Sequence, residues 1–171
     1  DIASNGTDLI MVAIKEYNSN DNYGFYTYKF NGSGWDDVDS PDFNLLYDGS
    51  STYQGRTAFG STVGVNTFVQ DGEIYAIALY SRHPQVRLYK YVDGSGFVEQ
   101  IKMFSYYTGG NQDFRKIFHN GEWWFMNNDV VFKLDSNLNF RNFSVAKTGI
   151  QTAYKSEPQS MYSVNGDLYI F

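Results

Sequence analysis

The sequence predicts an all-β protein built from antiparallel four-stranded repeats, and three observations support this prediction. Aromatic residues make up 19% of the chain, with 15 Tyr, 14 Phe and 3 Trp, and their flat rings suit pleated, half-buried strands. Asn-Gly or Asp-Gly recurs before aromatic or β-branched stretches, which indicates tight hairpins. Sixteen Gly with three Pro indicate many turns rather than a Pro-rich linker.

The Asn/Asp-Gly dipeptide marks the start of each repeat. It occurs at Asn5-Gly6, Asp71-Gly72, Asn120-Gly121 and Asn165-Gly166. Asn and Asp tolerate the positive φ angles of a type I′ turn, whose twist matches that of paired strands. The turn glycines stand at positions 6, 72, 121 and 166, so the spacings are 66, 49 and 45 residues. We therefore expect units at about 1–60, 61–110, 111–150 and an incomplete 151–171, within one repeat-built domain or a fragment of one.

A second, Gly-rich turn completes each unit. The segment from Tyr28 to Trp35 (YKFNGSGW) aligns with that from Tyr89 to Phe97 (YKYVDGSGF) with one inserted residue, and a degenerate copy spans 132–140. Each unit thus contains four strands, A to D: A and B flank the Asn/Asp-Gly turn, C carries an aromatic-Lys-aromatic triplet, and D follows the Gly-rich turn. Four short strands per 40 to 50 residues or so are typical of a β-propeller blade. We expect consecutive propeller blades, with a β-trefoil as the alternative.

The two turn motifs resemble those of known propeller repeats. The Asp/Asn-Gly-x-aromatic turns and the Gly-Ser-Gly-Trp and Gly-Ser-Gly-Phe turns are similar to propeller repeats of the kelch, tachylectin and fungal fucose-lectin kind. The resemblance covers nearly the whole chain. It implies a propeller architecture and does not specify a ligand.

Charge and composition exclude several classes of function. The net charge is −6 and the sequence pI is about 4.7, so the chain lacks the basic surface that binds phosphate backbones, and nucleic acid is not an expected partner. Anionic membranes are disfavoured for the same reason. There is no cysteine, which excludes disulfides and thiolate metal sites. Apolar runs such as 9–14 are short, so no membrane-spanning helix is expected.

The connections between strands predict where a ligand binds. In an up-and-down sheet the A–B and C–D turns lie on one edge, and the B–C and D–A connections lie on the other. The second set is longer and more variable: 16–23, 81–85, 127–129, 47–60, 106–113 and 147–157. Variable polar loops on a rigid scaffold are common binding sites, and Tyr and Asn there suit sugars or peptides. The candidate ligand-binding residues are Asn20, Asp21, Arg82, His83, Tyr106, Tyr107, Asn111, Gln112, Asp113 and Tyr154.

These loops and the absence of catalytic motifs predict a non-catalytic recognition module that binds glycans. We expect it on a secreted or virion-surface protein, with a glycan or another protein chain as the partner. One alternative is a structural component of a larger assembly. The other is a propeller-type glycoside hydrolase, which needs two carboxylates flanking one bond; Asp21, Asp113, Asp129 and Glu157 could supply them. His83 and His119 are isolated and predict neither a triad nor a metal site.

Four other aromatic residues are predicted to be core. Trp123 and Trp124 are adjacent on a strand, so their indoles point to opposite faces, where blade packing requires bulky side chains. Trp35 and Phe97 occupy matched positions after the Gly-rich turn and are also expected in the core.

No cofactor is expected, and calcium is the alternative. The acidic stretch 36–42 (DDVDSPD) places Asp36, Asp37, Asp39 and Asp42 close together in sequence. Such oxygen ligands could bind calcium, although solvated loop charge is the simpler interpretation.

The repeats at the two ends of the pattern are incomplete. The first unit has only a short strand A, and the last has strands A and B without C and D. A closed propeller leaves no exposed strand edge. We therefore expect the missing strands to come from a longer chain or from a second subunit.

Overall fold

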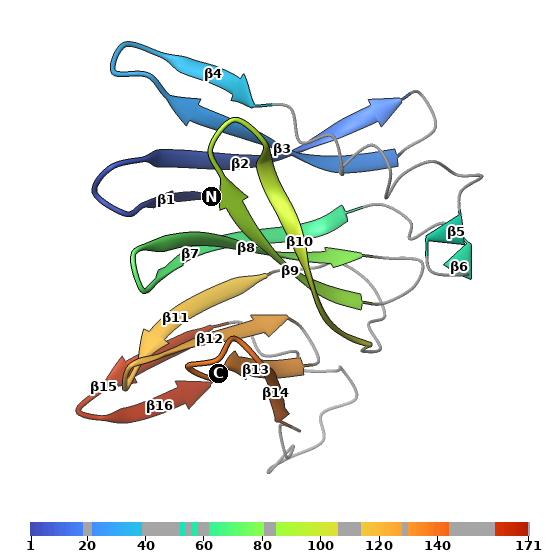
Figure 1. Cartoon of the computed structure of the whole chain (residues 1–171). Helices are drawn as coiled ribbons and strands as arrows, with labels where there is room; N and C mark the ends of the chain where they lie inside the picture. Colours follow the sequence, from blue (N-terminus) through green and yellow to red (C-terminus); the bar gives the residue numbers. More distant parts are fainter. Residues whose placement is uncertain are drawn as a thin grey trace. The chain divides into compact units, whose positions relative to one another are not determined.

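The computed structural model describes residues 1–18, 22–38, 52–53, 56–57, 62–80, 85–105, 114–127, 130–143 and 160–170. All regular elements among these residues are β-strands (Figure 1), which confirms the all-β prediction. No helix long and apolar enough to cross a membrane occurs in this described part of the chain. The strands fall into two compact parts, each larger than one sequence repeat. From here on we call Asp1–Ser105 unit 1 and Tyr106–Phe171 unit 2.

Unit 1 contains two four-stranded antiparallel sheets. The first sheet has the order β1 (Ile2–Ser4), β2 (Leu9–Asn18), β3 (Asn22–Phe30) and β4 (Trp35–Val38). The second is formed by β7 (Thr62–Gln70), β8 (Glu73–Tyr80), β9 (Gln85–Val92) and β10 (Gly96–Ser105). A short pair, β5 (Thr52–Tyr53) and β6 (Arg56–Thr57), lies between them in sequence. Each large sheet is a meander, as the A-to-D pattern predicts.

Unit 2 repeats this design. The third sheet is formed by β11 (Arg115–His119), β12 (Glu122–Asn127), β13 (Val130–Leu134) and β14 (Phe140–Phe143). The hairpin of β15 (Met161–Val164) and β16 (Asp167–Ile170) follows, and β15 contacts β11.

Three of the four Asn/Asp-Gly turns have the predicted geometry. Asp71, Asn120 and Asn165 have φ angles of 51°, 49° and 52°, and each is followed by a Gly with positive φ, as a type I′ turn requires. The first turn differs because Thr7 is an additional residue. Ser4 pairs with Leu9, and the Oδ1 atom of Asn5 accepts hydrogen bonds from the backbone N–H groups of Thr7 and Asp8 at 3.0 and 2.8 Å. The type I′ prediction is therefore wrong for this turn.

Each sheet has two faces, which we name by the lysine on its third strand. Lys29 pairs with Ile10, Lys90 with Tyr75 and Lys133 with Trp124. Because directly opposite residues in a sheet share a face, these pairs and the residues two positions away define the lysine face of each sheet. The opposite face is the back face. The β15–β16 hairpin has no third strand among the described residues, but Tyr169 holds the position of Ile10 relative to its turn, and so marks the same face.

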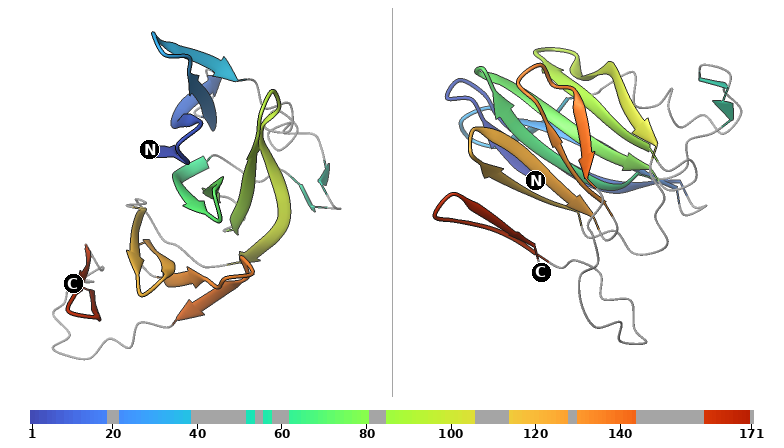
Figure 2. Two further views of the ribbon diagram at one scale, coloured as in Figure 1. Left: turned by 60° about the vertical axis from the view of Figure 1, so that its left-hand side comes forward. Right: turned by 90° about the horizontal axis from the view of Figure 1, so that it is seen from below.

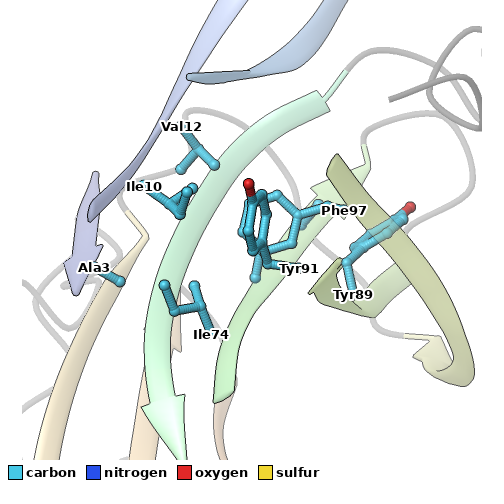
Figure 3. Packing of buried hydrophobic residues seen from close by; sticks show 9 residues of the cluster. Ala3, Ile10, Val12, Ile74, Tyr89, Tyr91 and Phe97 are labelled. Carbon is cyan, nitrogen blue, oxygen red and sulfur yellow. The ribbon is translucent and has the colours of Figure 1, made fainter. Parts of the chain in front are cut away.

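In unit 1 the lysine face of the first sheet packs against the back face of the second (Figure 3). The first sheet contributes Ala3, Ile10 and Val12, and the second contributes Ile74, Ala76, Ala78, Tyr89, Tyr91 and Phe97. Ile10 and Phe97 are fully buried, and burial of such a side chain contributes about 1.5–3 kcal/mol. Phe97 therefore lies in the core as predicted.

The same contact occurs in unit 2. Trp124, Met126 and Val131 on the lysine face of the third sheet pack against Met161, Leu168 and Ile170 on the back face of the β15–β16 hairpin. Trp124 is thus a core residue. Trp123 lies on the opposite face, as predicted, where its ring contacts Phe118 with centroids 5.0 Å apart.

Trp35 corrects a prediction. It was expected in the core, but 38% of its surface is exposed. It lies on the back face of the first sheet, where it pairs with Phe30 at a ring-centroid distance of 5.5 Å. In unit 1 a neighbouring sheet covers the back face of the second sheet, and this cover is what buries the matched residue Phe97.

Candidate functional site

The strand order gives each four-stranded sheet two different edges. In the second sheet the β7–β8 turn at 71–72 and the β9–β10 turn at 93–95 lie at the same end of the strands, because neighbouring strands are antiparallel. The same holds for the tight turns of the first and third sheets. Figure 2 shows these hairpin turns at one end of each sheet. We call this end the turn edge and the opposite end the connection edge.

All the predicted ligand-binding residues belong to segments that leave from connection edges. Asn20, Asp21, Arg82, His83, Tyr106, Tyr107, Asn111, Gln112, Asp113 and Tyr154 lie outside the described residues. So do Asp129 and Glu157 of the predicted carboxylate set. The flanking strand ends are described: β9 begins at Gln85, β10 ends at Ser105 and β11 begins at Arg115. The structure therefore shows where these segments are anchored, and the residues themselves remain predictions.

At the turn edge, the lysine of each four-stranded sheet pairs with an acidic residue that follows the Asn/Asp-Gly turn. Asp8 binds Lys29 at 2.8 Å, Glu73 binds Lys90 at 3.1 Å and Glu122 binds Lys133 at 2.6 Å. These pairs were not predicted from the sequence, although an acidic residue follows each Asn/Asp-Gly turn. Each pair is partly exposed and contributes about 0–1 kcal/mol. We therefore interpret it as a signature of the fold rather than as a reactive site.

Asparagine side chains connect consecutive turns within each unit. The Asn5 side-chain amide donates to the carbonyl oxygen of Gly72 at 2.9 Å, and the Asn120 amide donates to the carbonyl oxygen of Gly166 at 3.1 Å. Both bonds run from the turn of one repeat to the turn of the next. We call this contact the turn bridge.

His119 is part of the turn bridge in unit 2. The Asn120 amide also lies 3.1 Å from Nε2 of His119, and Nδ1 of His119 lies 2.8 Å from the Ser163 hydroxyl. An amide N–H can only donate, so Nε2 accepts and Nδ1 carries the proton toward Ser163. The ring is buried. Its two nitrogens are thus committed to holding the hairpin against the third sheet, which is a structural role.

The acidic stretch does not converge on one point where it is described. Asp36 and Asp37 are consecutive on β4 and pair with Lys29 and Tyr28, which lie on opposite faces. Asp36 instead accepts a hydrogen bond from the Asn31 amide at 2.9 Å. Asp39 and Asp42 lie outside the described residues. In the described ranges no group of three or more His, Cys, Asp or Glu side chains could hold a metal ion.

A buried ion pair lies in the core of unit 1. The Arg87 guanidinium and the Glu99 carboxylate are 2.8 Å apart, with side-chain exposures of 1% and 11%. Both residues lie on the back face of the second sheet, next to Tyr89. A charge pair at this depth could suggest chemistry, but each group is bound by its partner and both are buried, so we interpret the pair as structural. In the sequence, Arg87 stands between the apolar residues Val86 and Leu88 of β9.

Comparison with known proteins finds no protein family and no curated protein that matches the chain.

Proposed function

We propose that the chain is a series of β-propeller blades that acts as a non-catalytic recognition module, with glycans as the ligand class. The meander sheets support the propeller architecture, because each has four strands in chain order. The repeated contact of one lysine face on the next back face supports it as well, since blades of a propeller stack side by side in one direction.

The observation that carries the functional proposal is the difference between the two edges. Tight turns occupy one end of each four-stranded sheet, and their side chains are engaged in ion pairs and turn bridges. The longer connections, with their Tyr, Asn, Arg and His residues, all leave from the other end. A rigid sheet that presents variable polar segments at one edge is a common design for binding.

The residue types of these segments favour sugars. Tyr106, Tyr107 and Tyr154 offer aromatic faces, and Asn111 and Gln112 offer amide donors and acceptors. Such sites combine an apolar platform with a few polar groups that fix orientation. An exterior location, on a secreted protein or a virion, follows from this ligand class and is part of the proposal.

The test is glycan-array screening of the whole chain, followed by calorimetric titration of the best ligand. Alanine at Tyr106, Tyr107 or Tyr154 is expected to weaken binding about two- to twelvefold, since an aromatic contact contributes about 0.5–1.5 kcal/mol. Asn137→Ala, on a turn edge, is the control and should bind like the parent chain. Absence of glycan binding, or binding that none of the three tyrosine substitutions changes, would contradict the proposal.

The same titration separates recognition from hydrolysis. A binding module leaves the glycan intact after long incubation, and mass spectrometry of the ligand checks this. Cleavage that is lost when Asp113 or Glu157 is replaced by the corresponding amide would instead favour the glycoside hydrolase alternative, because that reaction needs a carboxylate pair.

A further inference from the structure

The back faces of the first and second sheets carry aromatic residues at matched positions, but the exposure of these residues differs. The matched pairs, placed by their distance from Lys29 and Lys90, are Tyr28 with Tyr89, Phe30 with Tyr91, and Trp35 with Phe97. In the second sheet these residues are 0–6% exposed. In the first sheet Phe30 and Trp35 are each 38% exposed. The aromatic surface that is buried on the second sheet is therefore partly exposed on the first sheet.

This uncovered surface extends over all four strands of the first sheet, and we call it the open face. Its large apolar and aromatic members are Ile2, Leu9, Met11, Tyr28, Phe30 and Trp35, and the charged Asp37 lies opposite Tyr28 at its β4 edge. Met11 lies between Ile2 and Tyr28 in the sheet register, so the apolar side chains form one continuous patch. Ile2 is 50% exposed. Contiguous apolar patches on soluble proteins mark interaction sites.

The chain also carries the surface that would fit the open face. In both units a back face is covered by the lysine face of the preceding repeat. The lysine face of the β15–β16 hairpin carries Tyr162, Val164 and Tyr169, which are 55%, 49% and 46% exposed, and Asp167, opposite Val164, lies at its turn end. Tyr169 occupies the position that Ile10 holds in the first sheet and Trp124 holds in the third. This position therefore carries a large apolar or aromatic side chain in the hairpin, as it does in the sheet-to-sheet contacts of unit 1 and unit 2.

The turn bridge supplies a polar match at the same two surfaces. Asn5 bridges to Gly72 and Asn120 bridges to Gly166, always from one turn to the next. Asn165, in the turn of the hairpin, is the next donor in this series. Gly6, in the turn of the first sheet, is the acceptor that matches Gly72 and Gly166.

We propose that a second copy of this chain covers the open face with its β15–β16 hairpin, so that copies associate head to tail. The contact would repeat the packing found inside each unit, including a turn bridge from Asn165 of one copy to Gly6 of the next. Such a heterologous contact produces rings when the rotation closes and filaments when it does not. The inference is independent of glycan binding, because it concerns sheet faces and not the connection edges.

The first experiment measures the mass of the whole chain by sedimentation velocity over a range of concentrations. Species heavier than the 19.6 kDa monomer are expected, and they should dissociate on dilution. Tyr28→Lys on the open face and Tyr169→Lys on the hairpin should each reduce association at least tenfold, because either places a charge in an apolar contact. Val92→Lys is the control: Val92 is apolar and 42% exposed but belongs to neither surface. Circular dichroism confirms that each variant is folded.

The second experiment mixes the two variants. The Tyr28→Lys chain keeps an intact hairpin and the Tyr169→Lys chain keeps an intact open face, so the mixture should form one-to-one dimers and nothing larger. Non-specific hydrophobic aggregation would not show this complementation. A monomer at all concentrations, or association unchanged by both substitutions, would overturn the proposal. So would variants that lower thermal stability without changing mass, since the two surfaces would then be in contact within one chain.

Discussion

The sheet-to-sheet contact in unit 1 and the one in unit 2 follow the same rule with different side chains. In unit 1 the contact includes Tyr89, Tyr91 and Phe97, and the buried Arg87–Glu99 pair lies on the same face of the second sheet. In unit 2 the contact includes Trp124 and two methionines, Met126 and Met161. In both units a lysine face packs against a back face and an Asn side chain forms the turn bridge. The side chains that fill the space between the two sheets differ.

This comparison shows which part of the repeat is constrained. The turn bridge and the acid–lysine pair each need particular side chains at fixed positions near the turn. These residues recur in unit 1 and unit 2. Core side chains need only fill the space between two sheets, which many combinations of apolar residues do. A repeat can therefore lose similarity in its core before it loses similarity in its turns.

The largest expected effect is in the core of unit 1. Glu99→Ala leaves the Arg87 guanidinium buried without its carboxylate, and removal of one partner of a buried pair costs about 3–5 kcal/mol. Chemical denaturation of the whole chain measures this as a fall in the free energy of unfolding of unit 1. Glu73→Ala is the matched control: the Glu73–Lys90 pair is partly exposed, so its loss should cost about 1 kcal/mol or less. Equal costs for the two variants would show that burial does not distinguish them.

A smaller effect is expected at the turn bridge of unit 2. Asn120→Ala removes the donor to Gly166 and to His119, and the His119 nitrogen is buried, so the cost should be about 1–2 kcal/mol. Asn5→Asp removes the exposed donor to Gly72 but keeps an oxygen that can accept from the N–H groups of Thr7 and Asp8, so it should cost less. Hydrogen exchange of the β15–β16 amides checks whether the hairpin is loosened. A larger effect at Asn5 than at Asn120 would contradict the proposed role of His119 in unit 2.

Much of the fold could be predicted from the sequence, because its signals are local. Positive φ at Asp71, Asn120 and Asn165 follows from residue type, and strand order follows from the turns. Exposure could not be predicted in the same way. Trp35 and Phe97 hold matched positions, and only the neighbouring sheet determines that one is buried and the other is not.

The ligand-binding residues proposed from the sequence stay predictions. They belong to connections between strands, where the sequence has no periodic pattern from which a backbone path could be predicted. Both Tyr106 and Tyr154 lie outside the described residues. The ion pairs at the turn edge were missed for another reason. Asp8 and Lys29 are far apart in sequence, and only the β2–β3 register brings them together.

The smallest expected effect is a shift in the pKa of one carboxyl group of unit 1, that of Asp93. Lys29 binds Asp93 of the second sheet at 2.7 Å, and the hydrogen bond and charge of this lysine lower the pKa of Asp93 below its ordinary value of 3.8. A carboxyl whose pKa is lowered by folding stabilises the folded state above pH 3.8 or so, and this contribution is lost as the pH falls through the lower folded pKa. The turn bridge of Asn120 to Gly166 joins two uncharged groups and has no such dependence. Carbon-detected NMR titration of the Asp93 carboxyl should give a midpoint below 3.8, which Lys29→Met moves back toward that value. An unchanged midpoint in the Lys29→Met chain would show that the ion pair does not form between the two sheets in solution.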